Sequence, residues 1–177
     1  LNTVDAAIMG PDFMDEQAGY RAFIDPATFI DYHLMTELTK QIDGYRLSTF
    51  FHKDRSGKLK LGPIWDYNLS WGNANYYNGW NPEGWYYPLI TSEEYLDGWF
   101  SRLFQDDDFR RQYRRRYTLL RRGVFSNEHL IGKLRRDGEA AFARDVAAHP
   151  QTLHHVQPLV HSSARSPGLG SRPQELA

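Results

Sequence analysis

The chain has 177 residues, with 21 basic and 22 acidic side chains, a formal net charge of −1 and no cysteine. This near neutrality excludes a general attraction to nucleic acid or anionic lipid, and the lack of cysteine excludes disulfides, thiolate zinc sites and cysteine nucleophiles. Apolar residues make up 41% and aromatic residues 15%, which predicts a globular chain that forms one domain or part of a larger one.

Residues 1–24 show no sustained pattern and are predicted to form an irregular or part-helical lead-in. They begin without Met and contain no basic segment followed by an apolar one, and no apolar run in the chain reaches the ~18 residues of a membrane-spanning helix. We therefore expect a processed or cut piece of a longer protein, with no membrane span.

A helix is predicted from Ala27 to about Ile42. Asp25-Pro26 supplies an N-cap followed by proline at the first helical position. The apolar residues that recur every four positions are Ile30, Leu34, Leu38 and Ile42. The helix is expected to end near Asp43-Gly44, because glycine readily takes the left-handed conformation of a helix end.

A β-hairpin is predicted next, with strands at 45–53 and 58–66 joined by the turn sequence DRSG. Pro63 has no amide donor, so the second strand is expected to be an edge strand or to be interrupted there. Residues 70–88 then combine seven Trp and Tyr residues with glycine, asparagine and proline, which indicates a long aromatic loop.

The C-terminal half is predicted to be helical, with helices at 92–104, 107–122 and 127–148, the last capped by Ser126. From His149 onward prolines and glycines interrupt any apolar period, so residues 149–177 are predicted to be a disordered or non-native tail. The predicted fold class is therefore α+β: a helix, a β-hairpin, an aromatic loop and a helical C-terminal half.

Asp43 and Asp66 stand at the two ends of the predicted hairpin, so folding should bring their carboxylates together. Two such charges about 4 Å apart repel by roughly 4 kcal/mol at an effective dielectric constant near 20. A proton on one carboxyl, an Arg or Lys between them, or a bridging divalent cation would relieve this repulsion. Ser48 and Asn68 complete a set of oxygen ligands suited to magnesium. Alternatively, Asp43 caps the helix and Asp66 faces solvent or is hydrogen-bonded in the core.

The stretch from Asp25 to Asn73 closely resembles the spore coat protein H (CotH) kinase-like family, most specifically in IDGYRLSTFFHKD and GPIWDYNLSWGN. The later run WFSRLFQDDDFRRQYRRRYTLLRRGVFS resembles the helical part of the same family, so the likeness covers roughly residues 19–145. It implies an atypical protein-kinase-like phosphotransferase that uses ATP and Mg²⁺ on protein side chains, with the large lobe of a kinase-like fold in residues 1–148.

In that family Asp43 matches the catalytic-loop aspartate, and Asp66 matches the aspartate that binds the metal and nucleotide. Ser48 stands where protein kinases carry a metal-binding asparagine, so the second metal position rests on Ser48 or on Asn68. No glycine-rich phosphate loop and no nucleotide-pairing lysine strand precedes Asp43. We therefore expect the C-terminal portion of a kinase-like domain, weak or inactive alone, and whether it is an enzyme stays open.

The rival interpretation is a non-catalytic surface or coat protein that binds carbohydrate or a protein partner through the aromatic loop. Those rings could equally pack against the helices as a satellite core. Seven arginines between 110 and 122 predict a solvated helix face, or contact with an acidic substrate or nucleic acid. The buried stripe of this helix is predicted to be Phe109, Tyr113, Tyr117 and Leu120. The family implies a protein substrate and a spore coat, cell surface or secreted location, and we expect no nucleic acid partner.

Overall fold

The computed structural model describes residues 1–87 and 97–148, and it is an α+β chain with a small two-stranded sheet. Its contacts divide it into two compact units, residues 1–122 and 123–177, which are described separately. The predicted α+β class is confirmed at this level.

The first unit begins with two short helices, α1 (Asn2–Met9) and α2 (Tyr20–Phe23), which pack against each other, and α1 also packs on α4 (Asp97–Leu103). The prediction of a part-helical lead-in is thus confirmed. Of the helix expected at 92–104, only the segment from Asp97 lies within the described residues.

Helix α3 (Pro26–Thr39) starts where the sequence predicts and ends before the predicted boundary. The Asp25 side chain accepts a hydrogen bond from the amide of Ala27 at 3.1 Å. At the other end Lys40, not glycine, takes the left-handed conformation with φ 52°. The buried Lys40 ammonium donates to the carbonyls of Glu83 and Gly84 at 2.8 and 2.7 Å, which ties the end of α3 to the aromatic loop.

The β-hairpin is present but much shorter than predicted. Strand β1 (Phe51–His52) pairs antiparallel with β2 (Lys60–Leu61). The prediction that residues 45–50 form a strand is wrong, because the Asp43 carbonyl accepts the amides of Arg46, Leu47 and Ser48 and coils this segment into turns. The expected interruption near Pro63 is confirmed, since β2 ends at Leu61.

The aromatic loop follows a single 3-10 turn, η1 (Tyr67–Leu69). Its rings divide into two groups. Tyr86 is 1% exposed and belongs to the core, whereas Trp71, Tyr77, Trp80 and Trp85 are each more than half exposed. Neither a satellite core nor an exposed platform therefore describes the whole loop.

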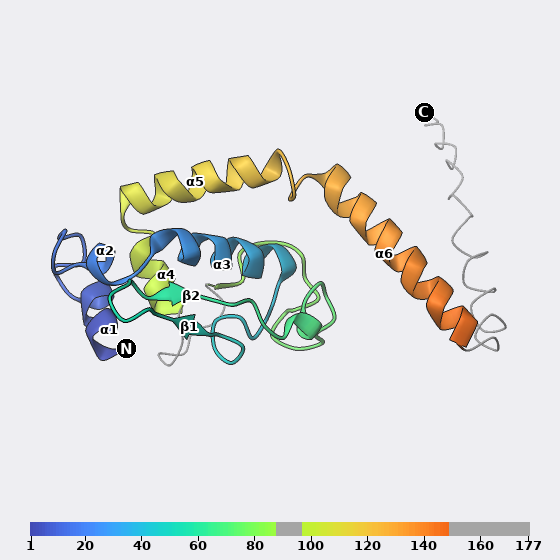
Figure 1. Ribbon diagram of the computed structural model, residues 1–177, viewed down its shortest axis with the longest axis horizontal. Coiled ribbons are helices and arrows are strands. Elements are labelled where there is room, and N and C mark those ends of the chain that lie inside the picture. Colours follow the sequence, from blue (N-terminus) through green and yellow to red (C-terminus); the bar gives the residue numbers. More distant parts are fainter. Residues whose placement is uncertain (88–96, 149–177) are drawn as a thin grey trace, which may run out of the picture. The chain divides into compact units, whose positions relative to one another are not determined.

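The core of the first unit lies between α3, α4 and α5 (Asp107–Arg121), and α3 and α5 run side by side (Figure 1). The fully buried His33 of α3 lies at its centre, ringed by aromatic side chains, with its Nδ1 2.9 Å from the hydroxyl of Tyr113. Phe109 and Tyr113 form the buried stripe of α5 as predicted, but Tyr117 is 46% exposed, so its predicted burial is wrong.

The second unit contributes α6 (Asn127–Ala148), whose predicted bounds are confirmed. The Ser126 hydroxyl accepts the amide of His129 at 3.1 Å, which confirms the predicted cap. The predicted tail at 149–177 lies outside the described residues. Among the described helices, none is both long enough and apolar enough to span a membrane.

Candidate active site

Gln41 joins the segment of Asp43 to the segment of Asp66. Its side chain is fully buried just after α3, its Nε2 donates to the carbonyl oxygen of Asp66, and its Oε1 accepts from the backbone amide of Asp43 at 3.3 Å. The two aspartates lie 23 positions apart in sequence (66 − 43), yet one amide side chain contacts both backbones. The folded chain therefore brings together the two ends of the predicted hairpin region.

The Asp43 carboxylate is 13% exposed and is paired with an arginine. Its Oδ1 lies 2.6 Å from Nη2 of Arg46, and the Arg46 guanidinium also lies over the ring of Tyr77 at 5.0 Å. The sequence left three ways to relieve the repulsion between the carboxylates: a proton, a basic side chain or a divalent cation. At Asp43 the structure shows the second, an arginine. The Asp43 carbonyl is equally well held, because it accepts three backbone amides.

The Asp66 side chain has a different environment. Asp66 is exposed and adopts the left-handed conformation, with φ 59° and ψ 53°, just before η1. Its carboxylate forms no hydrogen bond or ion pair with residues 1–87 or 97–148. Asn68, two residues further, is also exposed, while its backbone carbonyl accepts the side-chain amide of Asn73 at 2.7 Å. The carboxylate of Asp66 and the amide oxygen of Asn68 are thus accessible to a ligand.

Ser48 lies in the same turn as Asp43 and is 7% exposed. Its amide donates to the Asp43 carbonyl at 3.1 Å, and its own carbonyl accepts the hydroxyl of Tyr32 at 3.2 Å. The Tyr32 hydroxyl also donates to the carbonyl of Gly44 at 2.7 Å, so a side chain of α3 fixes both ends of this turn. The Ser48 hydroxyl forms no hydrogen bond within the described part of the chain.

No group of three or more His, Asp or Glu side chains in the described ranges is arranged to hold a metal ion. A cation here would need oxygen ligands from amide and hydroxyl groups in addition to a carboxylate. Asp66, Asn68 and Ser48 carry such oxygens, and these fit the preference of Mg²⁺ for one or two carboxylates completed by water and phosphate oxygens. Asp43 already has a counterion in Arg46.

Glu37 fastens the aromatic loop to α3. Its carboxylate accepts the Tyr45 hydroxyl at 2.8 Å and the backbone amides of Tyr86 and Tyr87 at 2.5 and 2.8 Å. Burial raises the pKa of Glu37 above its ordinary value, although these hydrogen bonds act in the opposite direction. The Tyr86 hydroxyl in turn donates to the carbonyl of Ile42 at 3.0 Å, next to Asp43. Glu37 is therefore a positioning group for this region.

Sequence reasoning missed Gln41, Arg46 and Lys40. Arg46 had a readable signal, because it follows Asp43 by three residues and can pair with it across one turn. Nothing in the sequence distinguishes Gln41 from an exposed glutamine at the end of a helix. Lys40 was not predicted at the left-handed position, because a glycine was expected to occupy it.

The family model of the CotH kinase protein matches this chain over residues 2–165. The match covers nearly the whole chain and includes Asp43, Ser48, Asp66 and Asn68. Searches of curated proteins and of solved structures gave no significant match.

The class defined by this match is that of the kinase-like proteins. The chain belongs to the CotH kinase family, which confirms the resemblance found in the sequence.

Proposed function

We propose that this chain forms the catalytic-loop and metal-binding part of a phosphotransferase that moves a phosphoryl group from ATP to a protein side chain. The observation that carries the proposal is the Gln41 bridge. It joins the backbone of an arginine-paired aspartate to that of an aspartate whose carboxylate has no partner among the described residues. Protein kinases use two aspartates in this division of labour, one at the acceptor hydroxyl and one at the metal.

In this proposal Asp43 orients the acceptor hydroxyl and takes its proton. Asp43 suits that role because Arg46 holds its carboxylate and three backbone amides hold its carbonyl before substrate arrives.

Asp66, with Asn68 or Ser48, would hold the magnesium. Bound Mg²⁺ and ATP would supply the phosphoryl group and neutralise the charge that develops during its transfer. The Asp66 carboxylate, the Asn68 side-chain amide and the Ser48 hydroxyl have no competing partner among the described residues.

Residues 1–148 are proposed to act as the large-lobe part of the kinase-like fold, and 149–177 as a tail without a role in it. Residues 1–42 contain no glycine-rich phosphate loop, so we expect the 177 residues by themselves to bind nucleotide weakly and turn over little. The family name suggests a spore-coat association, and we propose a coat or surface protein as the substrate.

A second candidate function is carbohydrate binding without catalysis. The exposed rings favour it, since Trp71 and Trp80 are each 56% exposed and Tyr77 62%. Flat, solvent-facing rings can pack against sugar faces while their polar edges stay hydrated.

The deciding experiment is the thermal unfolding of the 177-residue chain with and without Mg²⁺ and ATP. At a free ligand concentration ten times Kd, binding would stabilise the protein by about 1.4 kcal/mol. Asp66→Asn should abolish the shift, and asparagine is the right replacement because it tolerates the left-handed conformation of Asp66. Asp54→Asn, in the exposed turn of the hairpin, is the matched control and should keep it.

A full shift in Asp66→Asn would remove Asp66 from the metal site and contradict the proposal. The carbohydrate function would instead be supported by two results together. The unfolding temperature of the wild-type chain would not respond to Mg²⁺ and ATP, and Trp80→Ala would lose the binding of the chain to an immobilised glycan array.

A further inference from the structure

A hollow of about 490 Å³ lies beside α5 in the first unit, and none of the four candidate site residues lines it. Its volume falls within the roughly 300–1,000 Å³ that is usual for small-molecule sites. Among the described residues, five aromatic side chains and two arginines line it. The aromatic loop contributes Trp85 and Tyr87, Phe104 precedes α5, and Tyr113 and Tyr117 project from α5.

The inner walls of this hollow, Tyr113, Tyr87 and Phe104, are fixed by contacts with the core. Tyr113 is 7% exposed, its hydroxyl lies 2.9 Å from His33 Nδ1, and its ring packs edge-on to Phe104 at 5.1 Å. Tyr87 is anchored through its backbone amide, which donates to Glu37 at 2.8 Å. The hollow is therefore preformed on this side and needs little ordering when a ligand enters.

Two further rings are accessible to solvent. Trp85 is 53% exposed and Tyr117 is 46% exposed. Large rings that are half exposed beside a preformed apolar wall can pack on a flat ligand without a change in the core.

The charge of the hollow is positive. Arg110 is partly engaged, since it pairs with Asp107 and donates to the Phe104 carbonyl at 2.5 Å. Arg114 forms no ion pair or hydrogen bond with the described residues, and none of the described residues that line the hollow is acidic. A free guanidinium next to stacked rings suits an anion attached to an aromatic ring, because it can bind two oxygens of a phosphate or carboxylate at once.

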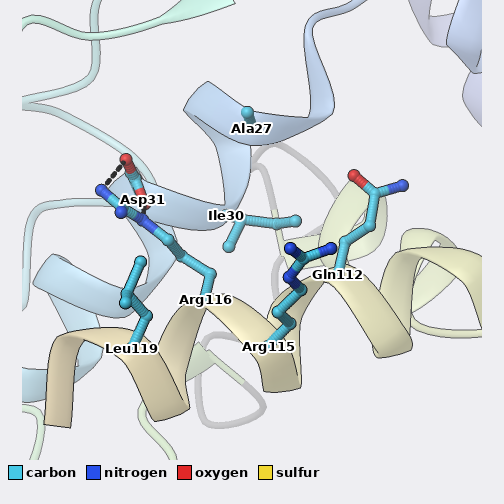
Figure 2. A pocket seen from close by; sticks show the side chains of 7 residues that line it. All are labelled: Ala27, Ile30, Asp31, Gln112, Arg115, Arg116 and Leu119. Atoms are coloured by element: carbon cyan, nitrogen blue, oxygen red, sulfur yellow. Dashed lines mark hydrogen bonds and ion pairs between the residues drawn. The ribbon is translucent and has the colours of Figure 1, made fainter. Parts of the chain in front are cut away.

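A second hollow on the same helix lacks these features. It measures about 370 Å³ and lies between α3 and α5, where the ion pair of Asp31 and Arg116 occupies one end and Arg115 lies beside Gln112 at the other (Figure 2). Its lining in residues 1–87 and 97–148 includes a carboxylate and no aromatic ring. Arg115 thus offers an internal comparison for Arg114, one residue away on the same helix.

We propose that the hollow lined by Trp85, Tyr117 and Arg114 binds a small aromatic anion, an aryl phosphate or aryl carboxylate. The ring packs against the aromatic walls, and the anion pairs with Arg114. This site is independent of the proposed phosphotransferase chemistry.

The test is a calorimetric titration of the 177-residue chain with phenyl phosphate, alongside phenol and inorganic phosphate. We expect saturable binding of phenyl phosphate at millimolar concentration or below, and at least about tenfold weaker binding of either control, because a charge-assisted contact contributes about that factor. Arg114→Gln should weaken binding by about tenfold or more, whereas Arg115→Gln should leave it unchanged. Asp66→Asn should also leave it unchanged, which separates this site from the proposed metal site.

Three results would overturn the assignment: no saturable binding, equal losses in Arg114→Gln and Arg115→Gln, or phenol binding as tightly as phenyl phosphate. Trp85→Ala tests the contact with the aromatic ring of the ligand, and it should weaken the binding of both phenyl phosphate and benzoate. A short peptide containing phosphotyrosine distinguishes the two sources of this chemistry: tighter binding than phenyl phosphate would identify a modified protein side chain, and weaker binding a free aryl acid.

Discussion

Replacing Glu37 with glutamine tests how α3 holds the aromatic loop. In the wild-type chain Oε1 accepts from Tyr45 and Tyr87, and Oε2 accepts from Tyr86. Glutamine can keep the first two bonds through its carbonyl oxygen, but its NH₂ group then faces the Tyr86 amide, donor against donor. A lost bond to a charged acceptor costs about 1.5–3 kcal/mol, and removing a buried charge returns part of it.

At neutral pH we therefore expect Glu37→Gln to lower the free energy of unfolding by about 1–2 kcal/mol. Glu37→Ala leaves all three donors without this acceptor and should cost about 3–5 kcal/mol, since each unsatisfied buried donor costs about 1–3 kcal/mol. Tyr45→Phe removes a single bond to the same carboxylate and should cost about 1.5–3 kcal/mol. Urea unfolding followed by circular dichroism gives all three values.

The pH dependence gives a sharper test of the same contact. Burial raises the pKa of Glu37 above its ordinary value of 4.5, so the folded state favours the protonated form more than the unfolded state does. The stability that this titration contributes is complete below the unfolded pKa and is lost as the pH rises through the folded pKa. Because glutamine does not titrate, the deficit of Glu37→Gln should be largest at acid pH and shrink as the pH rises from about 4.5. A deficit that grows with pH would refute the reasoning, since it would mean that the hydrogen bonds outweigh burial.

Two further substitutions test the site and the helix packing. Gln41→Leu removes both hydrogen bonds of a fully buried amide and should lower the free energy of unfolding, measured in urea, by about 2–4 kcal/mol. The control Gln17→Leu, at an exposed position, should change it by less than about 0.5 kcal/mol. Equal effects of the two substitutions would show that the Gln41 bridge does not form. Arg116 and Asp31 form an ion pair, and their side chains are 42% and 46% exposed. A double-mutant cycle to alanine should therefore give a coupling energy below about 1 kcal/mol, which decreases in about 1 M salt. A larger coupling energy that does not depend on salt would contradict this prediction.

The elements that the sequence predicts well are those with a local cause. The start of α3 follows from the cap at Asp25, and the start of α6 follows from Ser126, because each side chain satisfies an amide within its own first turn. The same holds for the end of β2 before Pro63, which has no amide to donate. Such features depend on a few neighbouring residues and need no knowledge of the fold.

The missed features depend on long-range contacts. Residues 45–50 are rich in β-formers, yet they form turns because the Asp43 carbonyl gathers three amides and Tyr32 of α3 anchors the same segment. Lys40 takes the left-handed position because its ammonium reaches carbonyls more than forty residues away in the chain, at Glu83 and Gly84. Local propensity does not include such partners, so tertiary contacts overrode it.

Asp43 and Asp66 are held in different ways, and this difference bears on their proposed roles. Asp43 is fixed by Arg46 at its carboxylate and by backbone amides at its carbonyl, so its side chain is placed before a substrate arrives. Asp66 is held through its carbonyl by Gln41, and its carboxylate remains exposed. A proton acceptor benefits from preorganisation, whereas a metal ligand must be free to meet an ion that arrives with the nucleotide. This difference supports the proposal that Asp43 acts as the positioned base and Asp66 as the metal ligand, because only Asp43 has its carboxylate held by an arginine.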